Sequence, residues 1–227
     1  MENQTADIEW KDSGVPVSSV FDDPYFSLDN GVEETQHVFI DGNDLTNRFR
    51  DGFRIGELGF GTGLNFLVAW DAWARHGAKG TLHFTSFEAF PMSSEDMAQA
   101  HRSFPDFDGK RDALLDAWSP EGGEMRFGDV VLTVVIGDAR RAVPAWDGLA
   151  DAWFLDGFSP AKNPELWEPE LLHDVARHTA PFGTAATYTA AGAVRRALES
   201  AGFAVERTTG ASSSVMDGIT SKSSRTS

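Results

Sequence analysis

Several absences limit what this sequence can encode. Cysteine is missing from all 227 residues, which excludes disulfides, thiolate catalysis and cysteine-ligated zinc or iron–sulfur sites. No apolar run approaches the roughly 20 residues needed to span a bilayer, so we expect no membrane segment. The opening run MENQTADIEW has neither a basic region nor an apolar core, which argues against a secretory signal. We therefore expect a cytoplasmic protein.

Basic residues are also scarce. The chain has 19 Lys and Arg against 35 Asp and Glu, a net charge of −16, which disfavours non-specific binding to nucleic acid. A small positive cleft within an acidic surface remains compatible with this total. The six histidines are scattered without metal-ligand spacing, so we expect no metal site. Hydrophobic residues at 41% and charged residues at 24% are an ordinary globular balance.

Residues 1–52 differ in pattern from the rest of the chain. Short strand-like runs at Trp10, Val15–Val17 and His37–Ile40 are separated by turn residues such as Gly14 and Asn30-Gly31. We expect a small β-rich extension over this range.

From Phe53 to Arg207, apolar strand patterns alternate with helical ones. This alternation predicts an α/β domain over 53–207, with a mostly parallel, Rossmann-like sheet covered on both faces. The expected strands are 53–58, 82–87, 130–136, 151–155, 184–189 and 203–207, and the expected helices are 64–75, 94–102, 111–118, 164–178 and 193–201. Ser93 is the expected N-cap of the second helix, with Asp96 at its third position.

The tail from 208 to 227 has a different composition. Eleven of its twenty residues are Ser or Thr, and only Val215, Met216 and Ile219 are strongly apolar. Such a segment buries too little surface to offset its ordering entropy, so we expect it to be disordered.

A glycine-rich turn follows the first predicted strand of the domain. The run GELGFGTGLNF (56–66) places Glu57 near the strand end, then Gly59, Gly61 and Gly63 at alternate positions before a helix. Glycine allows positive φ and close approach of a ligand to the backbone. The dinucleotide pattern G-x-G-x-x-G fits neither register, because positions 64 and 66 hold Leu and Phe. A purely structural turn and a nucleotide-like ligand site remain the alternatives.

A second candidate segment follows the strand 151–155. Asp156 opens the run DGFSPAKNP (156–164), which should face the same crevice as Gly59–Gly63, because ligands lie beyond the carboxyl ends of strands in open α/β sheets. An alkylamine has a pKa near 10.4, so its attack on a methyl donor requires loss of a proton. Asp156 is our candidate to orient an amine and accept that proton, the alternative being a simple Asp-Gly turn.

Together these segments resemble a family. The E-x-G-x-G-x-G pattern resembles motif I of class I S-adenosylmethionine (SAM)-dependent methyltransferases. With DDPYFS (22–27), GVEET (31–35) and FLDGFSPAKNP (154–164), the chain over about 8–207 resembles the MnmC-like methyltransferases. These enzymes methylate the 5-aminomethyl nitrogen of the wobble uridine in tRNA, either alone or as the amino-terminal half of a bifunctional protein.

The resemblance implies a set of site residues. It implies Asp156 as the catalytic residue. The residues it implies for SAM, together with acids at two later strand ends, are Glu57, Gly59, Phe60, Gly61, Gly63, Asn65, Glu88 and Asp138. The residues it implies for the substrate are Tyr25, Phe26, Glu33, Phe158 and Lys162.

The sequence departs from the family pattern in two places. The flavin-dependent oxidoreductase half is absent, so we expect no FAD in this chain and cooperation with a separate FAD-dependent oxidoreductase. The family's last strand, with its Lys- and Arg-rich segment, is replaced by GASSSVMD (210–217), with only Lys222 and Arg225 beyond it. We therefore expect that strand to be missing.

Three other functions stay open. The negative charge and the reduced basic segment favour a methyltransferase of a small-molecule amine. The altered carboxyl-terminal sequence is compatible with a non-catalytic SAM-binding partner of an oxidoreductase. An NAD-dependent oxidoreductase is the weakest alternative, because of the glycine spacing.

Overall fold

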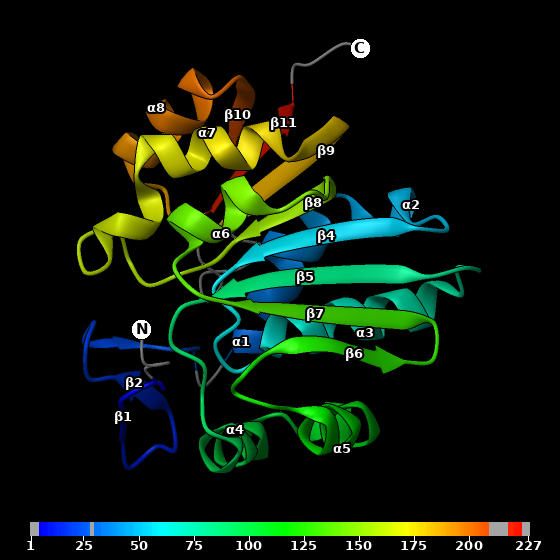
Figure 1. The fold of residues 1–227 in the computed structure, drawn as a ribbon, viewed down its shortest axis with the longest axis vertical. Coiled ribbons are helices and arrows are strands. Elements are labelled where there is room, and N and C mark those ends of the chain that lie inside the picture. Colours follow the sequence, from blue (N-terminus) through cyan, green and yellow to red (C-terminus); the bar gives the residue numbers. More distant parts are fainter. Residues whose placement is uncertain (1–4, 28–29, 209–217, 224–227) are drawn as a thin grey trace.

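An eight-stranded sheet forms the centre of the structure, which is a computed structural model (Figure 1). The structure describes residues 5–27, 30–208 and 218–223. In sheet order the strands are β10 (Phe203–Thr208), β11 (Gly218–Ser223), β9 (Thr179–Thr187), β8 (Ala150–Leu155), β4 (Phe53–Leu58), β5 (Leu82–Glu88), β7 (Val130–Ile136) and β6 (Gly123–Phe127).

The middle of the sheet is parallel. Strand β4 pairs with β5 and β8, and the parallel pairing continues to β7 on one side and β9 on the other. All six residues of β8 are buried, so this strand is covered on both faces, as expected for a parallel sheet between helices. The prediction of a mostly parallel α/β fold is confirmed.

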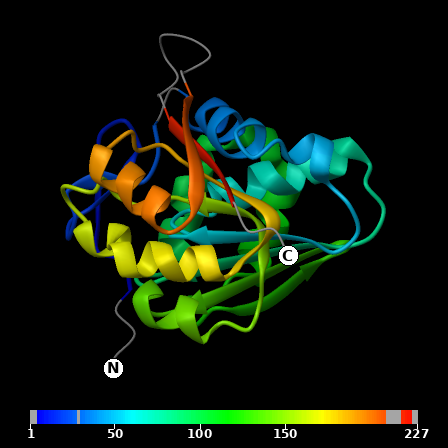
Figure 2. The ribbon, with the colours of Figure 1, turned by 90° about the horizontal axis from the view of Figure 1, so that it is seen from above.

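Helices cover both faces of this sheet (Figures 1 and 2). Helices α6 (Ala139–Ala145), α7 (Pro169–Arg177) and α8 (Gly192–Ser200) pack on one face, where Trp153 of β8 is fully buried. Helix α3 (Leu64–His76) packs on the other, in a core that also holds residues of α4 (Ser94–Ala100), α5 (Asp108–Ala117) and the 3₁₀ turn η3 (Pro105–Phe107). The 3₁₀ turn η2 (His101–Ser103) follows α4 directly. None of the described helices is long and apolar enough to cross a bilayer.

Local signals explain several element boundaries. The Ser93 side chain accepts a hydrogen bond from the Asp96 backbone N–H, so the predicted cap of α4 is confirmed. The single helix predicted over 164–178 is wrong in one respect, because it divides into a 3₁₀ turn η4 (Pro164–Trp167) and α7. Pro169 begins α7, where its missing N–H costs nothing. Strand β6 and helix α6 were not predicted.

The amino-terminal extension is only partly β-rich. Strands β1 (Ile8–Trp10), β2 (Pro16–Ser18) and β3 (Asp23–Pro24) form a small antiparallel sheet. Helix α1 (Gly31–Thr35), the π-helix η1 (Gln36–Asp41) and α2 (Leu45–Arg48) follow. The prediction of a strand at His37–Ile40 is therefore wrong. The apolar residues of this run belong to η1 and are buried, and the Phe39 ring stacks on Phe154 of β8. Such a short apolar run does not distinguish a strand from a buried helix.

The expectation of a disordered tail and a missing last strand is wrong for residues 218–223. These residues form β11, which lies between β10 and β9 and is antiparallel to both. Its register pairs Lys222 with Ala204 on one side and with Thr184 on the other. Backbone hydrogen bonds to two neighbours stabilise this strand, and side-chain composition does not report them. The rest of the predicted disordered segment, 209–217 and 224–227, lies outside the described residues.

Candidate functional site

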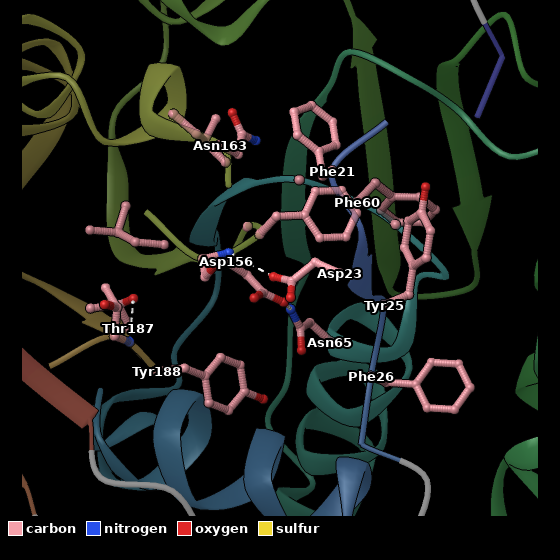
Figure 3. Close-up of a pocket in the computed structure, with 18 of the residues that line it drawn as sticks. Phe21, Asp23, Tyr25, Phe26, Phe60, Asn65, Asp156, Asn163, Thr187 and Tyr188 are labelled. Atoms are coloured by element: carbon pink, nitrogen blue, oxygen red, sulfur yellow. Dashed lines mark hydrogen bonds between the residues drawn. The ribbon is translucent and has the colours of Figure 1, made fainter. Parts of the chain in front are cut away.

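A cavity of about 1060 Å³ opens beyond the carboxyl ends of the central strands (Figure 3). Its lining comes from the turn after β4, the end of β5, the loop after β8, the segment after β9 and the amino-terminal extension. The cavity therefore lies where an open α/β sheet places its ligands. Both candidate motifs of the sequence contribute to it.

The glycine turn has a backbone that requires glycine. Gly59, Gly61 and Gly63 have φ values of +83°, +54° and +75°. A Cβ on Gly59 would lie 2.8 Å from the Asp156 carbonyl oxygen, and one on Gly61 would lie 3.3 Å from the Tyr25 ring. Gly59 and Gly61 line the cavity, whereas Gly63 is the N-cap of α3 behind it. The turn thus brings bare backbone to the cavity wall.

Phe60 anchors this turn. Its side chain is 3% exposed and stacks on Trp118, with ring centroids 5.1 Å apart. Phe60 also reaches the cavity lining. Its ring is therefore mainly a core contact that fixes the turn.

Glu88 binds the turn from the neighbouring strand. It ends β5, and its Oε2 accepts a hydrogen bond of 2.9 Å from the Gly61 N–H. Its Oε1 accepts one of 2.7 Å from the Phe90 N–H. The carboxylate lines the cavity, as the sequence predicted, and also holds the turn in place.

Asp138 lies at the start of α6 and also lines the cavity. Its carboxylate accepts from the Arg140 backbone N–H and forms an ion pair of 2.7 Å with the Arg140 guanidinium. This pairing lowers the pKa of Asp138. The side chain is therefore both a helix cap and a charged group at the cavity rim.

Glu57 is not at the cavity surface. It is fully buried near the end of β4 and is not among the lining residues, whereas Asn65 is. Its Oε1 accepts a hydrogen bond of 2.9 Å from Asn65 Nδ2, and its Oε2 has no hydrogen-bond partner among the described residues. Burial raises the pKa of Glu57 well above its usual range. The sequence predicts that this carboxylate helps to hold the ligand; in the structure the cavity-lining residue bound to it is Asn65.

Asp156 directly follows β8 and lines the cavity. Its Oδ2 accepts a hydrogen bond of 2.6 Å from the same Asn65 Nδ2, which points toward it in Figure 3. Burial raises the pKa of Asp156 to about 7, although hydrogen bonds from Asn65 and the Gly157 N–H oppose this rise. A carboxylate with such a pKa exchanges a proton readily near neutral pH.

Aromatic rings form the wall beside Asp156. Phe158 stacks on Phe21, with ring centroids 4.9 Å apart and an interplanar angle of 29°. Tyr25 meets Phe158 edge-on at 5.1 Å. Phe26 also lines the cavity, but its buried ring packs against Phe104. A flat ligand could stack against this wall.

Two predicted substrate residues lie elsewhere. Glu33 is exposed and is not among the lining residues, whereas its neighbour Glu34 is 7% exposed and does line the cavity. Lys162 is also outside the lining, and its ammonium is bound to Asp22 and Asp23. Lys162 therefore joins the loop after β8 to the extension.

Sequence reasoning missed several cavity residues, among them Thr35 and Tyr188. Rarity was an available signal, because the chain has two tyrosines, Tyr25 and Tyr188, and both line this cavity. Phe21 gave no signal of its own, because it reaches the cavity from the extension only through folding.

The lining is strongly acidic. Its basic side chain is Arg140, which pairs with Asp138 and Glu168. The acidic lining residues are Asp23, Glu34, Glu88, Asp138, Asp156 and Glu165. This balance favours ligands that carry positive charge. Within the described ranges, no group of three or more histidine or acidic residues could hold a metal ion.

Comparisons with known proteins show which proteins this chain is similar to. Residues 105–216 match a family model described as S-adenosyl-L-methionine-dependent methyltransferase. The chain is 47% identical over 216 residues to the tRNA 5-methylaminomethyl-2-thiouridine biosynthesis bifunctional protein MnmC of Pseudomonas fluorescens strain Pf-5. That alignment covers 90% of this chain and 33% of the relative. The MnmC of Chromobacterium violaceum is 45% identical over 223 residues, in an alignment that covers 92% of this chain and 33% of that protein.

A solved structure shares the fold. The crystal structure of MNMC2 from Aquifex aeolicus superposes with a TM-score of 0.78 at 24% sequence identity, over 99% of this chain and 72% of that one. The chain itself spans about a third of the length of the curated relatives it matches.

Proposed function

This chain belongs to the MnmC-like methyltransferase family, and we propose that it transfers the methyl group of SAM to the 5-aminomethyl nitrogen of the wobble uridine in tRNA. The observation that carries this proposal is the half-buried Asp156, which lies beside the glycine turn in one acidic cavity. The relatives named above are proteins of 5-methylaminomethyl-2-thiouridine biosynthesis in tRNA, and their names supply the substrate class.

The residues around the glycine turn fit SAM. Gly59 and Gly61 line the cavity with backbone that carries no side chain, and Glu88 is an acid at the end of the neighbouring strand. We assign the turn to the amino-acid part of SAM, Glu88 to its ribose hydroxyls, and Asp138 to the side of its adenine. SAM supplies a methyl group on a positively charged sulfur. The acidic lining suits that charge.

Asp156 would prepare the acceptor. An alkylamine is almost entirely protonated at neutral pH, and only its neutral form has a free electron pair for attack. With a pKa of about 7, the Asp156 carboxylate can accept an amine proton. The amine nitrogen forms a bond to the methyl carbon, the carbon–sulfur bond breaks, and its electron pair remains on sulfur. The proton lost by nitrogen goes to Asp156.

The aromatic wall would hold the base. Phe158, Phe21 and Tyr25 offer ring faces and edges beside Asp156, and a uracil ring stacks on such surfaces. We assign Phe158, Tyr25 and Glu34 to the acceptor side. We assign no role in the cavity to Glu33 and Lys162, because the first is exposed and the second is paired with Asp23.

The acceptor group must come from another reaction. We propose that a separate FAD-dependent oxidoreductase produces the aminomethyl uridine and that both enzymes act in the cytoplasm, where tRNA is modified. The oxidoreductase reaction then comes first, and this chain carries out the methylation that follows it.

The test is transfer of labelled methyl from SAM to tRNA that bears 5-aminomethyl-uridine, with tRNA lacking that group as control. We expect label only in the aminomethyl tRNA. A chain that is folded and binds SAM but labels neither tRNA would contradict the proposal.

A small-molecule amine is the second candidate acceptor. The net charge of −16 and the acidic lining favour it, because both disfavour a polyanion and attract a free ammonium group. Labelling of free amines but not of aminomethyl tRNA would select this candidate. SAM binding without transfer to either acceptor would indicate a non-catalytic partner.

A further inference from the structure

A buried chain of hydrogen bonds joins the amino-terminal extension to Asp156. Tyr188 OH lies 3.0 Å from Thr35 Oγ1, which donates a hydrogen bond of 3.0 Å to Asn65 Oδ1. Asn65 Nδ2 then donates to Glu57 and to Asp156. We call these five residues the Asn65 network. Thr35 and Asn65, at the centre of the network, are 1% and 6% exposed, and the hydrogen bonds of Asn65 with Thr35 and Glu57 are buried.

The chemistry of the network fixes its direction. Both N–H groups of the Asn65 amide face carboxylates, and a reversed amide would place its oxygen against both of them. The amide oxygen therefore points to Thr35, which must donate its only hydroxyl proton there. Tyr188 must in turn donate its proton to Thr35. Burial and the nearby Asp156 raise the pKa of Tyr188, which keeps this proton in place.

We propose that Asn65 is a positioning residue for Asp156, and that Thr35 and Tyr188 set the orientation of its amide. This inference rests on the proposed function. Thr35 comes from α1 of the extension and Tyr188 from the segment after β9, so elements outside both sequence motifs orient the acceptor carboxylate. Glu57 acts from beneath the cavity by holding the second N–H group of the same amide.

The network should also tune proton transfer. The Asn65 hydrogen bond stabilises the charged form of Asp156 and opposes the rise in its pKa caused by burial. Other titratable or charged groups line this cavity and stay unchanged in the variants below: Asp23 of β3, Tyr25, Glu34 of α1, Glu88 of β5, Asp138 and Arg140 at α6, Glu165 of η4, and Tyr188. Glu57 of β4, which contacts Asn65 from outside the lining, also stays unchanged. Weakening the Asn65 contact should therefore raise the pKa of Asp156.

Thr35→Val is the decisive variant, because valine keeps the shape of threonine and removes its hydroxyl. Thr35→Ser is the matched control, since it keeps the hydroxyl. Asn65→Leu removes the contact itself, but it also leaves the buried Glu57 without a donor and is expected to cost folding stability.

The first readout is the titration of Asp156, which carbon-13 NMR monitors in the full chain labelled at its aspartate carboxyls. The Asp156 signal is assigned as the one that is lost in Asp156→Asn. We expect the midpoint of Asp156 to rise by about 1 pH unit in Thr35→Val and to stay within ~0.3 unit in Thr35→Ser. An unchanged midpoint in Thr35→Val, or an equal shift in Thr35→Ser, would overturn the proposal.

The second readout is methyl transfer as a function of pH. In Thr35→Val, the acidic limb of the pH profile of kcat should move to higher pH by the same amount as the NMR midpoint. The Kd of SAM should stay within about threefold of wild type. A uniform loss of kcat without movement of the limb would indicate a merely structural role and contradict the proposal. If the wild-type chain methylates no aminomethyl tRNA, the proposed function fails, and the NMR titration alone decides the role of the network.

Discussion

The two halves of the cavity are built in different ways. The half that we propose for the methyl donor is a turn whose backbone forms the wall, with Gly59 and Gly61 at positive φ and Glu88 accepting a hydrogen bond from the Gly61 amide. The half that we propose for the acceptor consists of side chains from distant segments, such as Phe21, Tyr188 and Asp156. A backbone site requires certain residues at fixed spacing, so sequence reveals it. A side-chain site depends on which segments the fold brings together.

This difference makes the two halves separable by mutation. Changes in the donor half should alter SAM binding, and changes in the acceptor half should alter transfer with SAM binding intact. The following variants test that separation.

Asp156→Asn should have the largest effect. Asparagine keeps the size of the side chain but cannot accept the amine proton, so kcat should fall by about 10³-fold. The Kd of SAM, measured by calorimetry, should stay within about threefold of wild type. A parallel loss of SAM affinity would show that the halves are not independent.

Gly61→Val should act on the other half. A branched side chain at φ +54° is strained, and its Cβ would approach the Tyr25 ring to 3.3 Å within the cavity. We expect SAM affinity to fall by about 100-fold in calorimetry. Gly52→Val is the control, because Gly52 has φ +69° and open space around its Cβ. Equal losses of SAM affinity in the two variants would indicate that backbone strain, and not the position of Gly61 in the cavity, causes the effect.

The raised pKa of Asp156 should also appear in stability. A carboxyl whose folded pKa is about 7, above its unfolded value near 3.9, stabilises the folded state at low pH and loses that contribution as the pH rises toward 7. Asp156→Asn should therefore raise the free energy of unfolding by roughly 1–3 kcal/mol at pH 8 and leave it nearly unchanged at pH 4. Urea unfolding at both pH values checks this. A constant difference at the two values would contradict the assignment.

Phe158→Leu should have the smallest effect. It removes the ring that stacks on Phe21 but keeps an apolar side chain, so the KM for the tRNA acceptor should rise about fivefold. SAM affinity should not change. Phe182→Leu is the control, because Phe182 is 71% exposed and lies outside the cavity lining. An unchanged KM in Phe158→Leu would contradict the assignment of the aromatic wall to the acceptor.

Sequence reasoning found the parts of the fold that depend on local pattern. The β-branched run of β7, the cap at Ser93 and the glycine turn were predictable, because each is a short-range rule. It failed at His37–Ile40, where three apolar residues in a row fit either a strand or the observed π-helix. It also failed at β11, because a strand with neighbours on both sides gains its stability from backbone pairing with segments far away in sequence.

The candidate site divides in the same manner. The sequence predicted Asp156 and the glycines, and it also predicted Glu57 as a ligand-binding residue, whereas Glu57 lies outside the cavity lining and is hydrogen-bonded to the lining residue Asn65. It selected Glu33 instead of Glu34, because one step along a helix changes which side faces the cavity and the sequence did not reveal that helix. The sequence predicted Lys162 as a substrate residue, because it did not reveal that the fold places Asp22 and Asp23 beside this ammonium group.

The position of β11 has a consequence for how the protein is made. Strand β11 follows β10 in the sequence but does not lie at the edge of the sheet, because β10 lies outside it. On the ribosome, β9 and β10 both emerge before the strand that joins them. Until residues 218–223 leave the exit tunnel, β9 keeps an unpaired edge that other chains could join. Pairing of residues 218–223 with β9 therefore decides when this edge of the sheet is protected from aggregation.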